Sequence, residues 1–145
     1  MKRARVLTCA ILFFASAVFA HTGVKNAAVK ARMDAMSGIG AETKTLGEMA
    51  KGKTVFDQTT ARAAFAAIAK RAADTPALFE AEEDDPKSEA KPAIWSNFDD
   101  FVAKSRDLEK IAIGFSTSIT SENELAIAIK SLGSSCQACH KAYRE

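Results

Sequence analysis

Two cysteines and a histidine near the C-terminus are the residues of this chain best suited to chemistry. They form the string Cys136-Gln137-Ala138-Cys139-His140, and Cys-x-x-Cys-His is the attachment pattern of a c-type haem. Each thiol can add across one vinyl group of the porphyrin to form a thioether, and the two intervening residues let the thiols reach vinyls on neighbouring pyrroles. The adjacent imidazole then comes under the iron as its proximal ligand. The spacing predicts one covalent haem c.

Three other uses of the same residues compete with haem attachment. A thioredoxin-like site places its cysteine pair at a helix N-terminus, where the helix dipole lowers a thiol pKa, whereas this pair ends the last helical pattern. A zinc site needs a fourth ligand, and the only other histidine is His21. A disulfide closing the short loop between the two cysteines is the third alternative.

The first 20 residues read as an export signal. Three basic side chains within Met1–Arg5 precede an apolar stretch from Val6 to Val18, and Val18-Phe19-Ala20 presents small residues where a signal peptidase cleaves. The apolar run is about 13 to 15 residues, which is short for a membrane span. We predict a signal peptide over residues 1–20 and a periplasmic mature domain over 21–145 without a membrane anchor. An uncleaved anchor is the alternative.

Charge and composition exclude two classes of function. Without the basic residues Lys2, Arg3 and Arg5, the 20 Lys and Arg fall to 17 against 18 Asp and Glu, a net charge of −1. Nucleic-acid binding therefore loses its electrostatic basis. No nucleophile, base and orienting group come together, and the only internal histidine is assigned to the iron. We expect no enzyme.

The composition favours helices. The chain has 29 alanines but only 7 glycines and 3 prolines, and alanine has the highest helix propensity. We predict an all-α protein, an antiparallel four-helix bundle with a covalently attached haem. The predicted helices run from about Val24 to Ala50 with a stop at Gly52, from Asp57 to about Ala73 with a stop at Thr75-Pro76, from around Pro92, and from the capping box that Ser121 opens. We expect the acidic run Glu82–Pro86 to be a solvated loop.

The haem motif shares a helix face with the predicted core. Apolar residues of the last helix recur at three- and four-residue steps, and this stripe continues into the motif. The stripe is Leu125, Ala128, Ile129, Leu132, Cys136, Cys139, His140 and Tyr143. The haem is therefore expected in or against the bundle interior. The protein without haem should then be substantially less helical, because its alanine-rich side chains alone bury a thin core.

Two residues of the first predicted helix face the same interior. Met36 lies mid-helix on the inward stripe, where its thioether is either core filling or a soft ligand for haem iron. Met33 is a second candidate ligand. Arg32 lies one turn before Met36, where it can pair with a haem propionate, hold a distal water network, or form a surface ion pair.

A leader, four helices and Cys-x-x-Cys-His at the extreme C-terminus resemble the class II cytochromes c, the cytochrome c′ family. The resemblance covers residues 24–145. The stretches that carry it are Val29-Lys30-Ala31-Arg32, Lys51-Gly52 with Phe56-Asp57, Lys91-Pro92-Ala93-Ile94-Trp95, and Cys136 through Tyr143-Arg144.

The resemblance implies a left-handed bundle in the periplasm with His140 as the proximal ligand. In the low-spin members a methionine of the first helix is the sixth iron ligand and the role is electron transfer. In the high-spin members the distal side is open and binds nitric oxide or carbon monoxide. Counted back from Lys51-Gly52, the deciding position is Met36, so the chain is most similar to the low-spin members. The family also implies redox partner proteins, a contact between Arg32 and the haem, and a possible homodimer.

Overall fold

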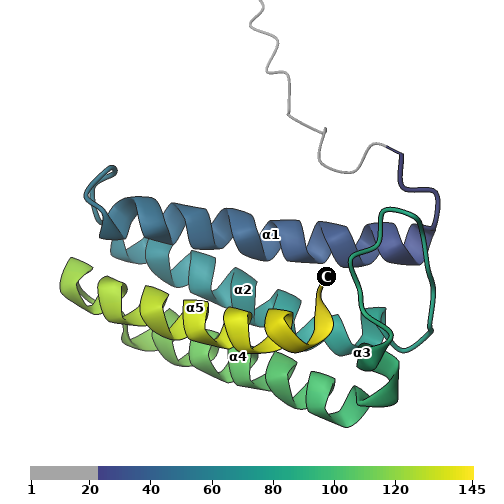
Figure 1. Cartoon of the computed structure of the whole chain (residues 1–145). Helices are drawn as coiled ribbons and strands as arrows, with labels where there is room; N and C mark the ends of the chain where they lie inside the picture. The colour runs from purple at the N-terminus through teal and green to yellow at the C-terminus, as the bar shows by residue number, and fades with distance from the viewer. Residues whose placement is uncertain (1–22) are drawn as a thin grey trace, which may run out of the picture.

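Four long helices form an antiparallel bundle in the computed structural model, which describes residues 23–145 (Figure 1). The helices are α1 (Ala27–Ala50), α2 (Gln58–Leu78), α3 (Ala93–Ser96), α4 (Phe98–Ser118) and α5 (Glu122–Tyr143). The one-turn helix α3 lies at the start of α4. Around the bundle, α1 packs on α2, α2 on α4, α4 on α5, and α5 back on α1. The predicted all-α four-helix architecture is confirmed.

Polar caps begin three of the long helices. The Asn26 side chain accepts a hydrogen bond from the backbone N–H of Val29, and the Asp57 side chain accepts one from Thr60. Each bond satisfies a helix N–H that has no intrahelical partner. Ser121 and Glu124 form the predicted capping box of α5. Asn26 explains why α1 begins at Ala27 and not near Val24 as predicted.

The predicted end of the second helix at Thr75-Pro76 is wrong, because α2 continues through Pro76 to Leu78. Proline lacks the N–H that would bond the carbonyl four residues earlier, here that of Ala72. That carbonyl accepts instead from the Ser105 hydroxyl of α4 at 2.7 Å. One long-range hydrogen bond thus replaces the missing intrahelical one.

The predicted third helix is divided in two. Asn97 lies between α3 and α4 with φ −134° and ψ 45°, outside the helical region. Pro92 comes just before the first helical residue, and the Trp95 indole N–H donates to the carbonyl of Phe79 at 2.8 Å. This bond orients α3 against the segment that follows α2.

The buried side chains form two clusters. The larger one contains Leu46, Phe65, Ile68, Leu125 and Leu132, which come from α1, α2 and α5 and are essentially inaccessible to solvent. The smaller one joins Phe79, Ile94, Phe101 and Tyr143.

The structure describes the chain from residue 23 onward. The predicted signal peptide and His21 lie outside the described residues. Within residues 23–145, no helix combines the length and the apolar character that crossing a membrane requires.

Candidate haem site

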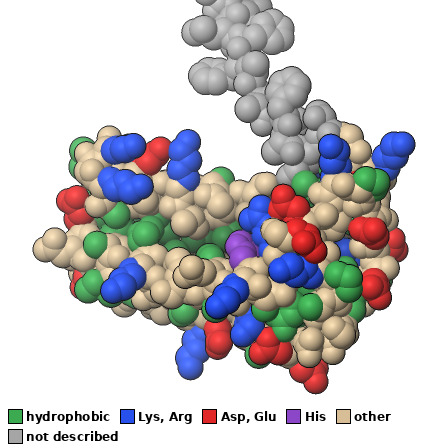
Figure 2. Space-filling view, in the orientation of Figure 1, with side chains coloured by type: hydrophobic (Ala, Val, Ile, Leu, Met, Phe, Trp, Pro, Cys, Tyr) green, Lys and Arg blue, Asp and Glu red, His purple; other side chains and the backbone are tan. Residues whose placement is uncertain are grey.

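A cavity of about 440 Å³ opens between α1 and α5 and reaches the small aromatic cluster. Such a volume lies within the range of ligand-binding pockets. Its walls come from α1, α2, α4, α5 and the segment 87–90. Figure 2 shows a hollow lined by hydrophobic side chains beside a histidine, and His140 is the only histidine of residues 23–145.

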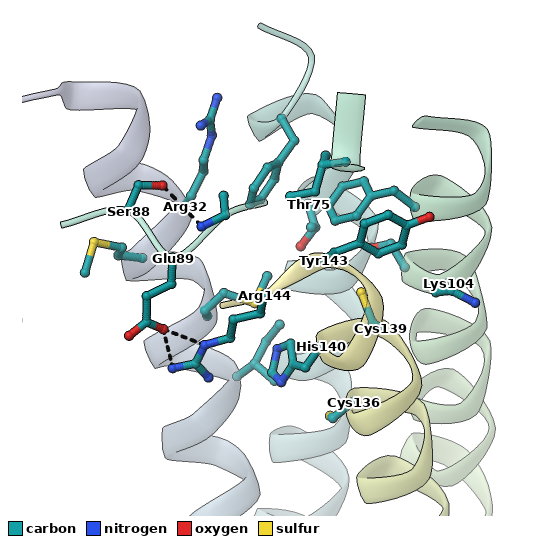
Figure 3. Close-up of a pocket in the computed structure, with 18 of the residues that line it drawn as sticks. Arg32, Thr75, Ser88, Glu89, Lys104, Cys136, Cys139, His140, Tyr143 and Arg144 are labelled. Atoms are coloured by element: carbon teal, nitrogen blue, oxygen red, sulfur yellow. Dashed lines mark hydrogen bonds and ion pairs between the residues drawn. The ribbon is translucent and has the colours of Figure 1, made fainter. Parts of the chain in front are cut away.

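The three motif residues lie on the last turns of α5 and line this cavity (Figure 3). Cys136 and Cys139 are half-buried, and neither is in a disulfide. Burial raises the pKa of both thiols. Burial, and secondarily the nearby charge of Arg144, lowers the pKa of the His140 imidazole. A neutral imidazole is the form that binds a metal.

Two methionines of α1 line the same cavity. Met36 and Met33 are both half-buried there, and Met36 also packs against the larger core cluster. The thioethers of Met36 and Met33 and the imidazole of His140 therefore line the same cavity.

Arg32 is buried, with 3% of its surface exposed. Its guanidinium donates to the carbonyl of Leu78, the last residue of α2, at 2.8 Å. It also donates to two carbonyls of the segment after α2, those of Ala81 at 2.6 Å and Glu83 at 2.7 Å. It also lies over the rings of Phe79 and Trp95, 4.7 and 5.4 Å from their centroids. Arg32 lines the cavity but does not sit at a solvated rim. Burial lowers its pKa, and the carboxylate of Glu83 opposes that effect.

The prediction of a solvated acidic loop is wrong at Asp85, which is buried. Glu82, Glu83 and Asp84 are exposed, but Asp85 is only 6% exposed. Its carboxylate accepts from the backbone N–H groups of Lys25 at 2.8 Å, Asn26 at 3.0 Å and Lys87 at 2.9 Å. These bonds lower the pKa of Asp85. They also tie the connection after α2 to the start of α1.

The C-terminus pairs with the segment before α3. An isolated antiparallel bridge joins Ala90 to Arg144. The Arg144 side chain donates to the Glu89 carboxylate with its Nε at 2.6 Å, and both residues line the cavity (Figure 3). The bridge holds the 87–90 wall against the end of α5.

The sequence reasoning missed a polar chain beside the cysteines. The Tyr143 hydroxyl donates to Asp100 at 2.5 Å, and the Lys104 ammonium lies 3.5 Å from the same carboxylate. The hydrogen bond to Asp100 raises the pKa of Tyr143 to about 12. The spacing of Asp100 and Lys104, four residues apart on one helix, was a readable signal for their ion pair.

The donor set fits a haem. A covalent haem c needs two free thiols and an imidazole on one helix turn, facing a mainly apolar space. Cys136, Cys139 and His140 meet that description, and the other walls supply aliphatic and aromatic side chains such as Val29, Ile94 and Phe101. Among residues 23–145, no group of three or more His, Cys, Asp and Glu residues forms an alternative metal site.

Known proteins share the sequence pattern and the fold of this chain. The family model for cytochrome c′ matches residues 27–144. Cytochrome c-556 of Agrobacterium fabrum is 35% identical over 144 residues, covering 97% of this chain and 94% of that protein. The cytochrome c′ structure from Rhodopseudomonas palustris has a TM-score of 0.77 at 28% identity and covers 83% of this chain and 98% of its own. The structural model of oxidized cytochrome c556 from R. palustris has a TM-score of 0.76 at 27% identity, covering 82% and 96%.

The fold and the site thus define a four-helix-bundle cytochrome of the c type. More particularly, the chain belongs to the cytochrome c′ family, the class II cytochromes c, whose members carry one covalently attached haem c. The similar proteins include both c-556 and c′ cytochromes. The family alone therefore leaves the second axial position of the iron open.

Proposed function

We propose that this protein is a periplasmic one-electron carrier whose haem iron is ligated by His140 and Met36. Cys136 and Cys139 hold the haem through thioethers. The observation that carries the proposal is that Met36 of α1 and His140 of α5 line one cavity. The similarity to the cytochromes c-556 supports it.

The bound haem supplies the site that takes up and releases one electron. The chain determines how it does so. Ligation of the iron by the Met36 thioether together with the His140 imidazole would raise the reduction potential. The apolar lining from Val29, Ile94 and Phe101 keeps water away from the ring. Met36 and His140 come from the neighbouring helices α1 and α5 and would hold the iron in both oxidation states, so little would have to rearrange when an electron moves.

Export is part of the same proposal. Cleavage after Ala20 would release a domain of residues 21–145 into the periplasm, where its thiols need protection from oxidation. Thioether formation gives that protection. A homodimer is compatible with this proposal, and sedimentation of the haem-loaded protein measures it.

An absorption spectrum of the purified haem-loaded protein tests the ligation. We expect low-spin bands in both oxidation states and the near-infrared band of a methionine–ferric iron bond. Met36→Ala should abolish that band and give a high-spin spectrum. Met33→Ala is the matched control, since Met33 lines the same cavity one turn away, and it should leave the band in place.

The competing function gives an opposite spectrum. A high-spin wild-type protein that shifts on adding carbon monoxide to its reduced form would replace the carrier by a gas-binding cytochrome c′. A Met36→Ala variant that stays low-spin would show that another residue, with Met33 the first to examine, is the ligand.

A further inference from the structure

The outer face of α4 and α5 carries a second, more open depression of about 1030 Å³, which we call the α4–α5 groove. Its lining residues are Lys104, Asp107, Lys110, Ile111, Gly114, Phe115, Ser118, Lys130, Ser131, Ser134, Ser135 and Ala138. Lys104 and Ser135 also line the haem cavity. The groove therefore adjoins the haem site across the side chains of these two residues.

The groove is positively charged. Its lining contains the lysines Lys104, Lys110 and Lys130 and one carboxylate, that of Asp107. Lys104 is already paired with Asp100, so the excess positive charge comes from Lys110 and Lys130. Lys110 and Lys130 are exposed, and neither has an ion-pair partner within residues 23–145.

The lysines of the opposite pair of helices are neutralised locally. Lys44 of α1 faces Glu48, and Lys70 of α2 faces Asp74, each four residues further along its own helix. Both lysines leave little uncompensated charge on their face. Among the lysines of the four long helices, only Lys110 and Lys130 in the groove and Lys141 at the end of α5 have no ion-pair partner within the described residues.

Apolar side chains accompany this charge. Only three large hydrophobic side chains are strongly exposed in the part of the chain that the structure describes: Val55, Ile113 and Ile127. Ile113 lies three residues after Lys110 on α4, and Ile127 lies three residues before Lys130 on α5. They are 51% and 65% exposed, and each lies one helix turn from one of the two unpaired lysines, beside the groove and not in its lining. Protein–protein interfaces combine apolar contacts with a polar, solvent-accessible rim, and exposed isoleucines next to lysines can supply both.

We propose that the α4–α5 groove docks an acidic redox protein and is the face through which the haem exchanges electrons. The proposal rests on the electron-carrier function above and names the partner's chemistry. Lys110 and Lys130 attract carboxylates of the partner, while Ile113 and Ile127 supply the contact after encounter. Lys104 and Ser135 separate the groove from the cavity that would hold the haem, so one electron would be exchanged between that haem and the partner's metal centre past these two residues, without bond or proton transfer.

The first test maps where anions approach and does not depend on electron transfer. Hexacyanochromate(III), an inert paramagnetic trianion, is titrated into isotope-labelled, reduced haem-loaded protein while backbone amide signals are recorded. We expect the strongest broadening at residues 107–114 and 130–135. Equal broadening around Lys44 and Lys70 would overturn the proposal, because the charge would then be spread over the whole surface.

The second test measures electron transfer by stopped-flow spectroscopy, with an acidic blue-copper protein and hexacyanoferrate(III) as two oxidants. Lys110→Glu/Lys130→Glu should slow both reactions roughly tenfold at low ionic strength, with convergence at high salt. Lys44→Glu/Lys70→Glu is the matched control, because it changes the net charge by the same amount, and it should have less than about a twofold effect.

A third variant separates the apolar contact from the charge. Ile113→Ser/Ile127→Ser should slow the reaction with the copper protein several-fold and leave that with hexacyanoferrate(III) unchanged. Equal slowing by the two charge reversals, or no slowing by either, would overturn the proposal.

Failure of the electron-carrier function and failure of the docking proposal give different results. A high-spin, carbon-monoxide-binding wild type would contradict the carrier function, whereas the hexacyanochromate map would still report on the groove. A salt-sensitive dimer that is lost in Lys110→Glu/Lys130→Glu would replace the acidic redox partner by a second copy of this chain. Sedimentation of the wild type and of Lys110→Glu/Lys130→Glu at low and high salt tests for this dimer.

Discussion

The two halves of the bundle are stabilised in different ways. In the half near the α1–α2 and α4–α5 connections, Leu46, Phe65, Ile68, Ile119 and Leu125 are fully buried and pack against one another. In the half that holds the haem cavity, side chains leave about 440 Å³ between the helices. Hydrophobic burial alone can hold the first half together, but it cannot hold walls apart in the second.

Directional polar bonds take over in the cavity half. The buried polar side chains of residues 23–145 are Arg32, Thr75, Asp85 and Ser105, and all four bond the backbone around the cavity or the segment that closes it. A buried polar group is costly unless it is hydrogen-bonded. The hydrogen bonds offset this cost. They also fix the positions of α2, α4 and the connection after α2, which keeps the space for the cofactor open.

Removal of the haem should produce the largest difference between the halves. Cys136→Ser/Cys139→Ser cannot form thioethers, so the covalent haem band on a denaturing gel should disappear completely. We expect amide hydrogen exchange to accelerate most strongly in α5 beyond Leu132 and in the start of α4, while residues near Leu46 and Phe65 keep their protection. Circular dichroism should show a substantial loss of helix. Uniform loss of protection, or unchanged helicity, would contradict the comparison.

The sequence predicts the apolar half better than the cavity half, for a physical reason. Helix periodicity and the caps at Asp57 and Ser121 are local patterns within one or two helix turns. The haem motif is also local, and for that reason it is the part of the cavity half that the sequence does predict. The bond from Ser105 to Ala72 joins residues 33 apart, and that from Asp85 to Lys25 joins residues 60 apart. No local window contains both partners, so the end of α2 and the burial of Asp85 could not be predicted. Whether Met36 ligates the iron stays a prediction.

Arg32 should be the most sensitive polar residue of the cavity half. Arg32→Met leaves the carbonyls of Leu78, Ala81 and Glu83 without their charged donor, and we expect a loss of about 3–5 kcal/mol in the free energy of unfolding. Arg62→Met is the matched control, because the half-buried Arg62 donates to a single carbonyl, that of Ile119, at 3.0 Å. It should cost only about 1 kcal/mol. Guanidinium unfolding of the haem-loaded variants measures both, and equal losses would show that the two halves use polar bonds alike.

The bond between Ser105 and Ala72 should have an intermediate effect. Ser105→Ala removes the donor to the Ala72 carbonyl, and Pro76 has no N–H to replace it. We expect a loss of about 1–3 kcal/mol in the free energy of unfolding. In that background Pro76→Ala restores an N–H that can donate to Ala72 within the helix, so part of the loss should be recovered. The double-mutant cycle must therefore show coupling between positions 76 and 105. Additive effects would mean that the bond from Ser105 to Ala72 is not what allows α2 to continue through Pro76.

The smallest effect should come from Asp85 and depend on pH. Three backbone N–H bonds hold the pKa of this carboxyl below its ordinary value of 3.8. A depressed folded-state pKa stabilises the protein above the unfolded-state value, and this contribution is lost as the pH falls through the folded-state value. Asp85→Asn should thus lower the melting temperature at neutral pH, and the difference from wild type should shrink below about pH 4. Asp84→Asn, at an exposed neighbouring position, is the control and should change neither. A deficit for Asp85→Asn that stays constant down to pH 2 would show that the Asp85 charge does not hold the connection to α1, and that the cavity half depends on its neutral bonds and on Arg32 alone.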